Sequence, residues 1–170
     1  MRKMLLWLIT ICAVAFGINF FMNNVGIPKS KLEADIRTSQ YVDDDWLMVG
    51  DVSDKMAAFV SYPEDKSDST YSFYVNRPGI SFGYFFRSGG DLVGFGQYIP
   101  ELMVDGYDER AFISMNELKV ERLEINDGNS VQVIEIDSEK PFAIILSVNA
   151  GELTFYDING NIVEFRRCYH

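Results

Sequence analysis

The sequence predicts a mainly β fold, an antiparallel β-sandwich or partly open barrel, placed after one N-terminal transmembrane helix. Two observations lead to this prediction. Residues 4–22 form an apolar run without a charged side chain, and from Tyr41 onward the hydrophobic pattern has a period of two, with turn-forming residues at near-regular spacing. The 170 residues leave room for one globular domain beyond the helix. We therefore expect one anchor and one β domain.

The apolar run is long enough to cross a membrane. At about 1.5 Å per residue its 19 residues cover nearly all of a hydrocarbon core of about 30 Å. Arg2 and Lys3 precede it and favour a cytoplasmic N-terminus. The predicted organisation is a cytoplasmic tail (1–3), a signal-anchor helix (4–22), a juxtamembrane linker (23–40) and an extracytoplasmic β domain (41–170).

Cleavage of the N-terminal segment is the alternative interpretation. Ala13-Val14-Ala15 has the small-x-small form that signal peptidase reads. A cut there would leave an unusually short signal, and the mature chain would begin with the apolar residues 16–22. The sequence therefore favours retention of the segment as an anchor, and we expect a single-pass protein of the cell membrane.

The linker is expected to contain a short helix. Turn formers and Pro28 end the first helix. Ser30-Lys31-Leu32-Glu33 has the form of a capping box, and Leu32 and Ile36 lie four residues apart, on one face of a helix. We predict a helical spacer that ends near Arg37.

Segments rich in aromatic and β-branched residues predict about ten strands. They are 46–52, 55–62, 70–76, 80–87, 92–99, 111–115, a bent strand within 116–125, 131–137, 142–148, and a final hairpin of 153–158 and 161–165. Ser88-Gly89-Gly90 is expected to close a strand, and the continuous apolar run 142–148 predicts burial on both faces. Asn159-Gly160 predicts a type I′ turn.

The charge and the cysteines restrict the partners and the compartment. Fifteen basic residues oppose 25 acidic ones, and two of the bases precede the apolar run, so the rest carries 13 against 25, a net charge of −12. Such a charge repels phosphate backbones and argues against nucleic-acid binding. Two cysteines, one of them inside the apolar run, favour a bacterial envelope over a disulfide-stabilised eukaryotic module.

Motifs for catalysis, metals or cofactors are scarce. The only histidine is His170, at the last position, where a catalytic triad is not expected. We expect no cofactor. Asp43, Asp44 and Asp45 could gather a hard cation if carbonyl groups joined them, although an acidic linker explains them as well. Asp105, Asp108 and Glu109 form a second acidic loop.

An aromatic strand is the most distinctive feature of the sequence. By alternation Phe82, Tyr84 and Phe86 share one face, while Phe85 and Arg87 point to the other. Burial in the core is the first interpretation of this row. The second is a face that stacks on sugars or docks a peptide, for which Phe82, Tyr84, Phe86 and Arg87 are the candidate binding residues.

Two functional hypotheses follow from the sequence. The first is a non-enzymatic binding module, tethered to the membrane by its N-terminal helix, whose partner is an envelope protein, a wall polymer or a neighbouring copy of the chain. The alternative is a membrane-tethered, carboxylate-dependent hydrolase that uses the acids at 43–45 or 105–109. A pocket with converging carboxylates would favour the enzyme, and a flat or aromatic face the binder.

Overall fold

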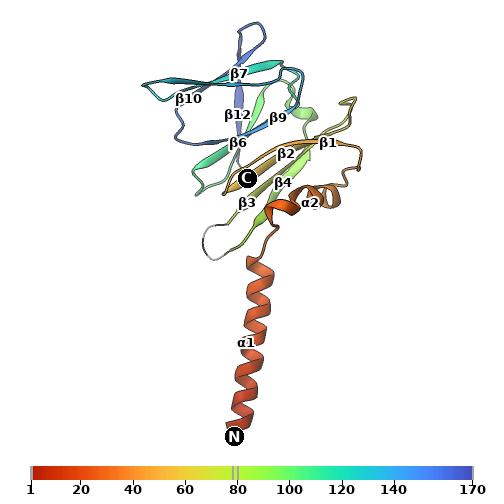
Figure 1. The fold of residues 1–170 in the computed structure, drawn as a ribbon, viewed down its shortest axis with the longest axis vertical. Coiled ribbons are helices and arrows are strands. Elements are labelled where there is room, and N and C mark those ends of the chain that lie inside the picture. Colours follow the sequence, from red (N-terminus) through yellow and green to blue (C-terminus); the bar gives the residue numbers. More distant parts are fainter. Residues whose placement is uncertain (1, 78, 80, 170) are drawn as a thin grey trace.

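The computed structural model describes residues 2–77, 79 and 81–169, with no side chain described at residues 2–6, 8, 22, 93 and 169. A long helix, α1 (Arg2–Asn24), projects away from a β-rich body (Figure 1). Ile80, the expected first residue of one strand, and His170 lie outside the described residues. Over the side chains that are described, no helix is both long and apolar enough to cross a membrane.

A short helical segment connects α1 to the body. It consists of a 3-10 turn, η1 (Lys29–Lys31), and the helix α2 (Leu32–Ser39). Leu32 and Ile36 are buried, as their spacing predicts. The capping box is wrong, because Ser30 lies in η1 and the residue that caps α2 is Lys31, which makes no side-chain capping bond.

The strands of the described chain form three four-stranded sheets. The first sheet has the order β1 (Leu47–Val52), β2 (Met56–Tyr62), β3 (Thr70–Asn76), β4 (Tyr84–Asp91). The middle sheet has the order β12 (Phe165–Tyr169), β5 (Ile99–Met103), β6 (Glu109–Ser114), β9 (Phe142–Ser147). The third has the order β11 (Ile162–Val163), β10 (Glu152–Asp157), β7 (Val120–Asn126), β8 (Val131–Glu135). Strand pairing is antiparallel except between β12 and β5.

The mainly β, largely antiparallel class is confirmed. The sheets stack in layers, and the described chain has three of them in place of the two of a simple sandwich. The sequence of β2 shows how the layers form. Met56, Ala58 and Val60 face the middle sheet, while Ala57 and Phe59 face α2. In β6, Ala111 and Ile113 face the first sheet and Phe112 faces the third. The middle sheet therefore lies between two apolar layers.

Several local predictions are wrong. Residues 92–99 are not a strand but contain a 3-10 turn, η2 (Val93–Phe95), and the strand begins only at Ile99. Ser88-Gly89-Gly90 lies inside β4 and does not close it. The strand β9 is partly buried, not buried on both faces throughout, because it forms an edge of the middle sheet.

The final hairpin exists, but its turn is not type I′. Gly160 has a φ of 79°, whereas Asn159 is not among the positive-φ residues. The Gly160 amide donates to the Asp157 carbonyl at 2.9 Å, and the Asp157 amide donates to the Asn161 carbonyl at 2.9 Å. This pattern fits a type I turn followed by a left-handed glycine, the commonest three-residue connection.

Candidate functional site

The aromatic strand follows the predicted alternation from Tyr84 to Phe86, but Phe82 does not. Tyr84 is buried, with 6% of its surface exposed, while Phe82 is 63% and Phe86 46% exposed. Arg87 is also exposed. Tyr84 and Phe86 do share one face, because they pair with Asn76 and Tyr74 of β3 without a bulge between them, and the rings of Phe86 and Tyr74 lie 5.5 Å apart. Phe82 alone leaves the predicted row, and its core interpretation is wrong.

Two local features change the predicted orientations, one at Phe82 and one at Arg87. Gly83 has a φ of 87°, which reorients the chain between Phe82 and Tyr84. In the pairing with β3, Tyr74 opposes Phe86 and Phe73 opposes Ser88, so Arg87 is the extra residue of a β-bulge. Glycine conformation and bulges cannot be read from a period-two pattern.

Asp43, Asp44 and Asp45 lie exposed in the loop between α2 and β1. The Arg37 guanidinium organises this loop, donating to the carbonyls of Asp43 at 2.6 Å and Trp46 at 3.2 Å. Among the described side chains no group of three or more His, Cys, Asp or Glu residues is placed to hold a metal ion. The conformation of this loop is therefore stabilised by the Arg37 side chain.

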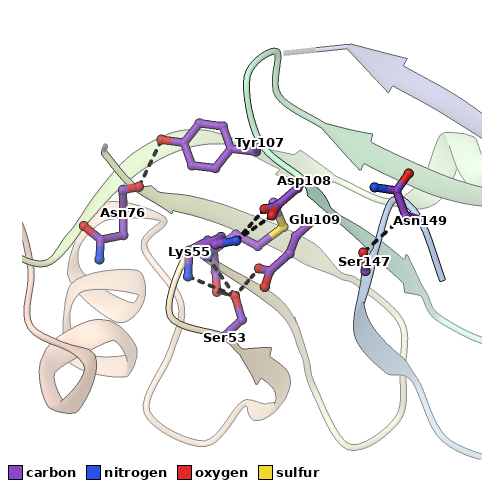
Figure 2. Close-up of polar contacts among 9 residues, drawn as sticks. Ser53, Lys55, Asn76, Tyr107, Asp108, Glu109, Ser147 and Asn149 are labelled. Atoms are coloured by element: carbon purple, nitrogen blue, oxygen red, sulfur yellow. Dashed lines mark hydrogen bonds and ion pairs between the residues drawn. The ribbon is translucent and has the colours of Figure 1, made fainter. Parts of the chain in front are cut away.

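The second acidic loop borders a cleft of about 440 Å³, here called the polar cleft (Figure 2). It is lined by residues from three turns and strand ends: Asp54, Lys55, Asn76, Arg77, Gly106, Tyr107 and Asp108. The turn between β1 and β2, the end of β3 and the turn between β5 and β6 meet here. The sequence indicates Asp108 and the adjacent Glu109 as an acidic loop, but no pattern in it indicates Ser53, Lys55 or Tyr107.

An ion pair crosses the polar cleft. The Lys55 ammonium lies 2.6 and 2.7 Å from the two carboxylate oxygens of Asp108. The hydrogen bond between them raises the pKa of Lys55 and lowers the pKa of Asp108. Both groups are therefore charged at neutral pH, and both remain in contact with solvent.

Ser53 joins the two sheets beside this ion pair. Its hydroxyl accepts hydrogen bonds from the amides of Lys55 at 3.1 Å and Met56 at 3.0 Å, and donates to the Glu109 carboxylate. One donor and two acceptor positions are all that a hydroxyl has. Ser53 is thus fully occupied in a turn and is not a free nucleophile.

Two tyrosines donate hydrogen bonds to backbone carbonyls in this part of the body, and Tyr107 lines the polar cleft. The Tyr107 hydroxyl donates to the Asn76 carbonyl at 3.0 Å, and the Tyr84 hydroxyl donates to the Ser53 carbonyl. Burial raises the pKa of both phenols, and nearby Asp54 and Glu109 raise that of Tyr84 further. Both tyrosines stay protonated and act as hydrogen-bond donors to the backbone.

The displaced carboxyl groups of the described chain can be compared with what acid catalysis requires. A carboxyl group that acts as general acid near neutral pH needs a raised pKa. Within the described chain the carboxyl groups with displaced pKa values are all displaced downward: Asp65, Asp108, Asp127, Asp137 and Asp157. Asp108 is moreover neutralised by Lys55. The ion pair connects the turn between β1 and β2 to the turn between β5 and β6.

A second charged cluster is buried in the middle sheet. Glu101 in β5 is 1% exposed and accepts from Arg110 Nη1 at 2.8 Å and from Arg167 Nε at 3.2 Å. The side chain of Arg110 is also buried, and its guanidinium lies 5.6 Å from the centre of the Phe112 ring. This cluster holds β5, β6 and β12 together and was not predicted.

The third sheet turns one face outward, at the end of the body opposite α1 (Figure 1). The strand pairing shows which residues lie on this outer face: Val133 opposes Glu124, Glu135 opposes Arg122, and Ile162 opposes Tyr156. The outer face therefore holds Val131 and Val133 of β8, Arg122 of β7, Tyr156 of β10 and Ile162 of β11. Val131, Val133 and Ile162 are exposed. The Arg122 guanidinium lies 4.4 Å from the centre of the Tyr156 ring. The outer face is thus partly apolar.

Comparison of the chain with protein-family models, with curated proteins and with solved structures found no match in any of the three.

Proposed function

We propose that α1 anchors this protein in a bacterial membrane and that the β body is a non-enzymatic interaction module on the extracytoplasmic side. One observation carries the proposal. Large apolar side chains of α1 are exposed, and the helix projects from the body without covering them (Figure 1). Such side chains require an apolar environment.

The distribution of these residues favours a bilayer over a single protein groove. The exposed large apolar residues of α1 are Trp7, Ile9, Ile11, Val14, Phe16, Ile18 and Phe21. At 100° per residue, Ile9 and Phe16 lie opposite Ile11 and Ile18, so more than one side of the helix is apolar. A helix of 23 residues is about 34 Å long at 1.5 Å per residue, which matches a hydrocarbon core of about 30 Å.

Charge supports the proposed orientation. Arg2 and Lys3 precede the uncharged run and favour its N-terminal end on the cytoplasmic side. The portion after the run carries a net charge of −12, from 13 basic and 25 acidic residues. A strongly acidic body keeps the module soluble outside the membrane and disfavours nucleic acid as a partner.

The outer face of the third sheet supports a binding role. It combines exposed valine and isoleucine side chains with an arginine on a tyrosine ring, and β8 is an edge strand of the sheet. Edge strands can pair with a strand from another chain, and apolar side chains beside them add affinity. We favour an envelope protein over a wall polymer as the partner for this reason.

Fractionation and protease protection test the anchor. The full-length chain is expected in the membrane fraction after alkaline extraction, and protease added to spheroplasts is expected to digest the body. Release of the full-length chain by alkali, a mature N-terminus at Phe16, or a body protected from external protease would each refute the proposed placement.

Site-specific photocrosslinking tests the binding face. A photoreactive residue at Val133 is expected to yield one discrete protein adduct in cells. The matched control is the same residue at Tyr41, which is 92% exposed but lies after α2, on the other side of the first sheet. Adducts to wall polymer alone, or equal labelling from both positions, would contradict a protein partner at the outer face.

A further inference from the structure

The hairpin between β3 and β4 is attached to the end of α1. The Phe82 amide donates to the Asn24 carbonyl at 2.8 Å, and the Gly26 amide donates to the Phe82 carbonyl at 2.6 Å. Ile27 and Tyr84 exchange a further pair of backbone hydrogen bonds, at 2.7 and 2.8 Å. The chain that leaves α1 is therefore paired with the first sheet, at the level where the helix ends (Figure 1).

Two glycines make this close approach possible. A Cβ atom on Gly26 would lie 2.5 Å from the Tyr84 carbonyl oxygen, and one on Gly83 would lie 2.7 Å from the Ile27 carbonyl oxygen. Gly83 also has the positive φ that favours glycine. The attachment is thus a specific backbone contact, which holds the hairpin at a fixed position relative to α1.

The attachment places an exposed phenyl ring beside the apolar surface of α1. Phe82 and Val25 are partners in a parallel β-bridge, and both are exposed, as is Phe21 one helical turn before Val25. The exposed apolar residues Trp7, Ile11, Val14, Ile18, Phe21 and Val25 follow one another at spacings of three or four, which places them along one stripe of the helix. Phe82 continues this stripe onto the β body.

A cation accompanies Phe82 at the same level. The exposed Arg77 donates through Nη1 to the Asn23 carbonyl at 3.3 Å, in the last turn of α1, and its guanidinium lies 3.9 Å from the centre of the Phe85 ring. An aromatic ring next to an arginine, at the end of an apolar helix, is the composition that membrane interfaces favour.

We infer that Phe82, with Arg77 at the same end of α1, is a membrane-interface anchor of the β body, which inserts at the headgroup level of the bilayer that α1 crosses. The inference rests on the proposed anchoring by α1. The inference gives Phe82, which is exposed and not part of the core, the lipid surface as its partner. It also implies that the body stands in a fixed orientation on the membrane, because the hairpin is bonded to α1 on one side and the ring enters the lipid on the other.

Lipid is favoured over a second copy of the chain as the occupant. A partner helix would cover the stripe that ends at Phe82, but would leave Ile9 and Phe16 on the opposite side of α1 exposed. A bilayer covers both sides of α1 and meets Phe82 where the helix leaves it.

Tryptophan fluorescence of the full chain in vesicles tests the inference. The two natural tryptophans, Trp7 and Trp46, permit three single-tryptophan variants. One is Trp46→Phe, which retains Trp7 in α1. The second adds Trp7→Phe and Phe82→Trp to it, and the third carries Ile162→Trp in place of Phe82→Trp. Ile162 is the matched control, because it is 69% exposed on the outer face of the third sheet. Far-UV circular dichroism verifies that each variant keeps the fold.

The expected result is a blue-shifted emission from Phe82→Trp that lipids brominated near the headgroup quench and aqueous iodide does not. Emission from Ile162→Trp should respond in the opposite way. If brominated lipid quenches Trp7 but iodide quenches Phe82→Trp as much as Ile162→Trp, the inference about Phe82 is overturned while the proposed anchoring by α1 stands. A Trp7 that lipid does not quench would overturn the anchor itself. Shielding of Phe82→Trp that depends on the protein-to-lipid ratio would instead assign a second copy as the occupant and overturn the lipid contact.

Discussion

Replacement of the buried Glu101 with leucine should destabilise the fold more than most substitutions in this chain. The carboxylate binds Arg110 and Arg167 from the two neighbouring strands, and its removal leaves the guanidinium of Arg110 buried without an opposite charge. Arg110 Nε has no hydrogen-bond partner, so no bond at that nitrogen compensates for the lost ion pair with Glu101.

The magnitude follows from the burial of both partners. Breaking a buried ion pair by removing one partner costs about 3–5 kcal/mol. Coulomb's law gives a similar value, about 4 kcal/mol for unit charges 4 Å apart at an effective dielectric constant of about 20. Against a typical total stability of about 5–15 kcal/mol, Glu101→Leu should remove a large part of the free energy of unfolding. The Arg167 side chain is 47% exposed, so Arg167→Ala should cost only about 0.2–1 kcal/mol.

Urea denaturation of the full chain in mild detergent, followed by circular dichroism, measures these differences. The decisive control is the double variant Glu101→Leu with Arg110→Met, which removes both charges and should recover most of the lost stability. A loss below about 1 kcal/mol for Glu101→Leu would show that the cluster does not have the energetic role assigned to it. A double variant no more stable than the single one would show that the cost is one of packing and not of unpaired charge.

Four further substitutions or conditions have definite expected outcomes. Tyr74→Phe removes the hydrogen bond that this buried hydroxyl donates to Asp35 Oδ2 at 2.8 Å and should cost about 1–3 kcal/mol in urea denaturation, because it loosens α2 from the first sheet. Phe82→Ala, in contrast to a core phenylalanine, should change the free energy of unfolding by no more than about 0.5 kcal/mol, and a large loss would return the ring to the core. Gly160→Val places a β-branched residue at a φ of 79° and should lower the thermal midpoint through a cost of about 1–2 kcal/mol. Hydrogen bonds from Asn161 and Asn159 lower the pKa of Asp157 below its usual 3.8. The Asp157 carboxylate therefore contributes its full stabilisation above pH 3.8 and loses it as the pH falls through the lowered pKa. Asp157→Asn should weaken the acid dependence of the urea midpoint below pH 3.8, and an unchanged dependence would refute the assignment.

The parts of the fold that sequence predicts are those fixed by local patterns. The strand 70–76 was predicted with the bounds that β3 has, because its aromatic and β-branched residues alternate between two apolar layers and polar loops flank it. The strand β5 was missed, since it holds Pro100 and the charged Glu101, two residues that argue against a central strand unless a partner is known. That partner, Arg110, comes from the neighbouring strand.

The candidate sites were harder to predict for the same reason. The polar cleft joins Lys55 to Asp108 across 53 positions of the sequence, and no spacing rule connects residues so far apart. The aromatic row failed at a single residue, Gly83, whose positive φ exposes Phe82 and buries Tyr84. A glycine between two aromatic residues was the only available signal, and it also fits an ordinary strand.

The parallel pairing of β12 with β5 has a consequence for the order of events during biosynthesis. Arg167 pairs with Glu101, 66 positions earlier, so the middle sheet gains its last strand only after residues 165–169 have been made. Contacts between such distant segments slow folding, because the loop must close before the pairing gives any gain. Until β12 has been made, β5 has one edge unpaired and Glu101 lacks Arg167. An unpaired edge can pair with another chain, so the partly folded protein is most exposed to aggregation and proteolysis in the interval before β12 pairs.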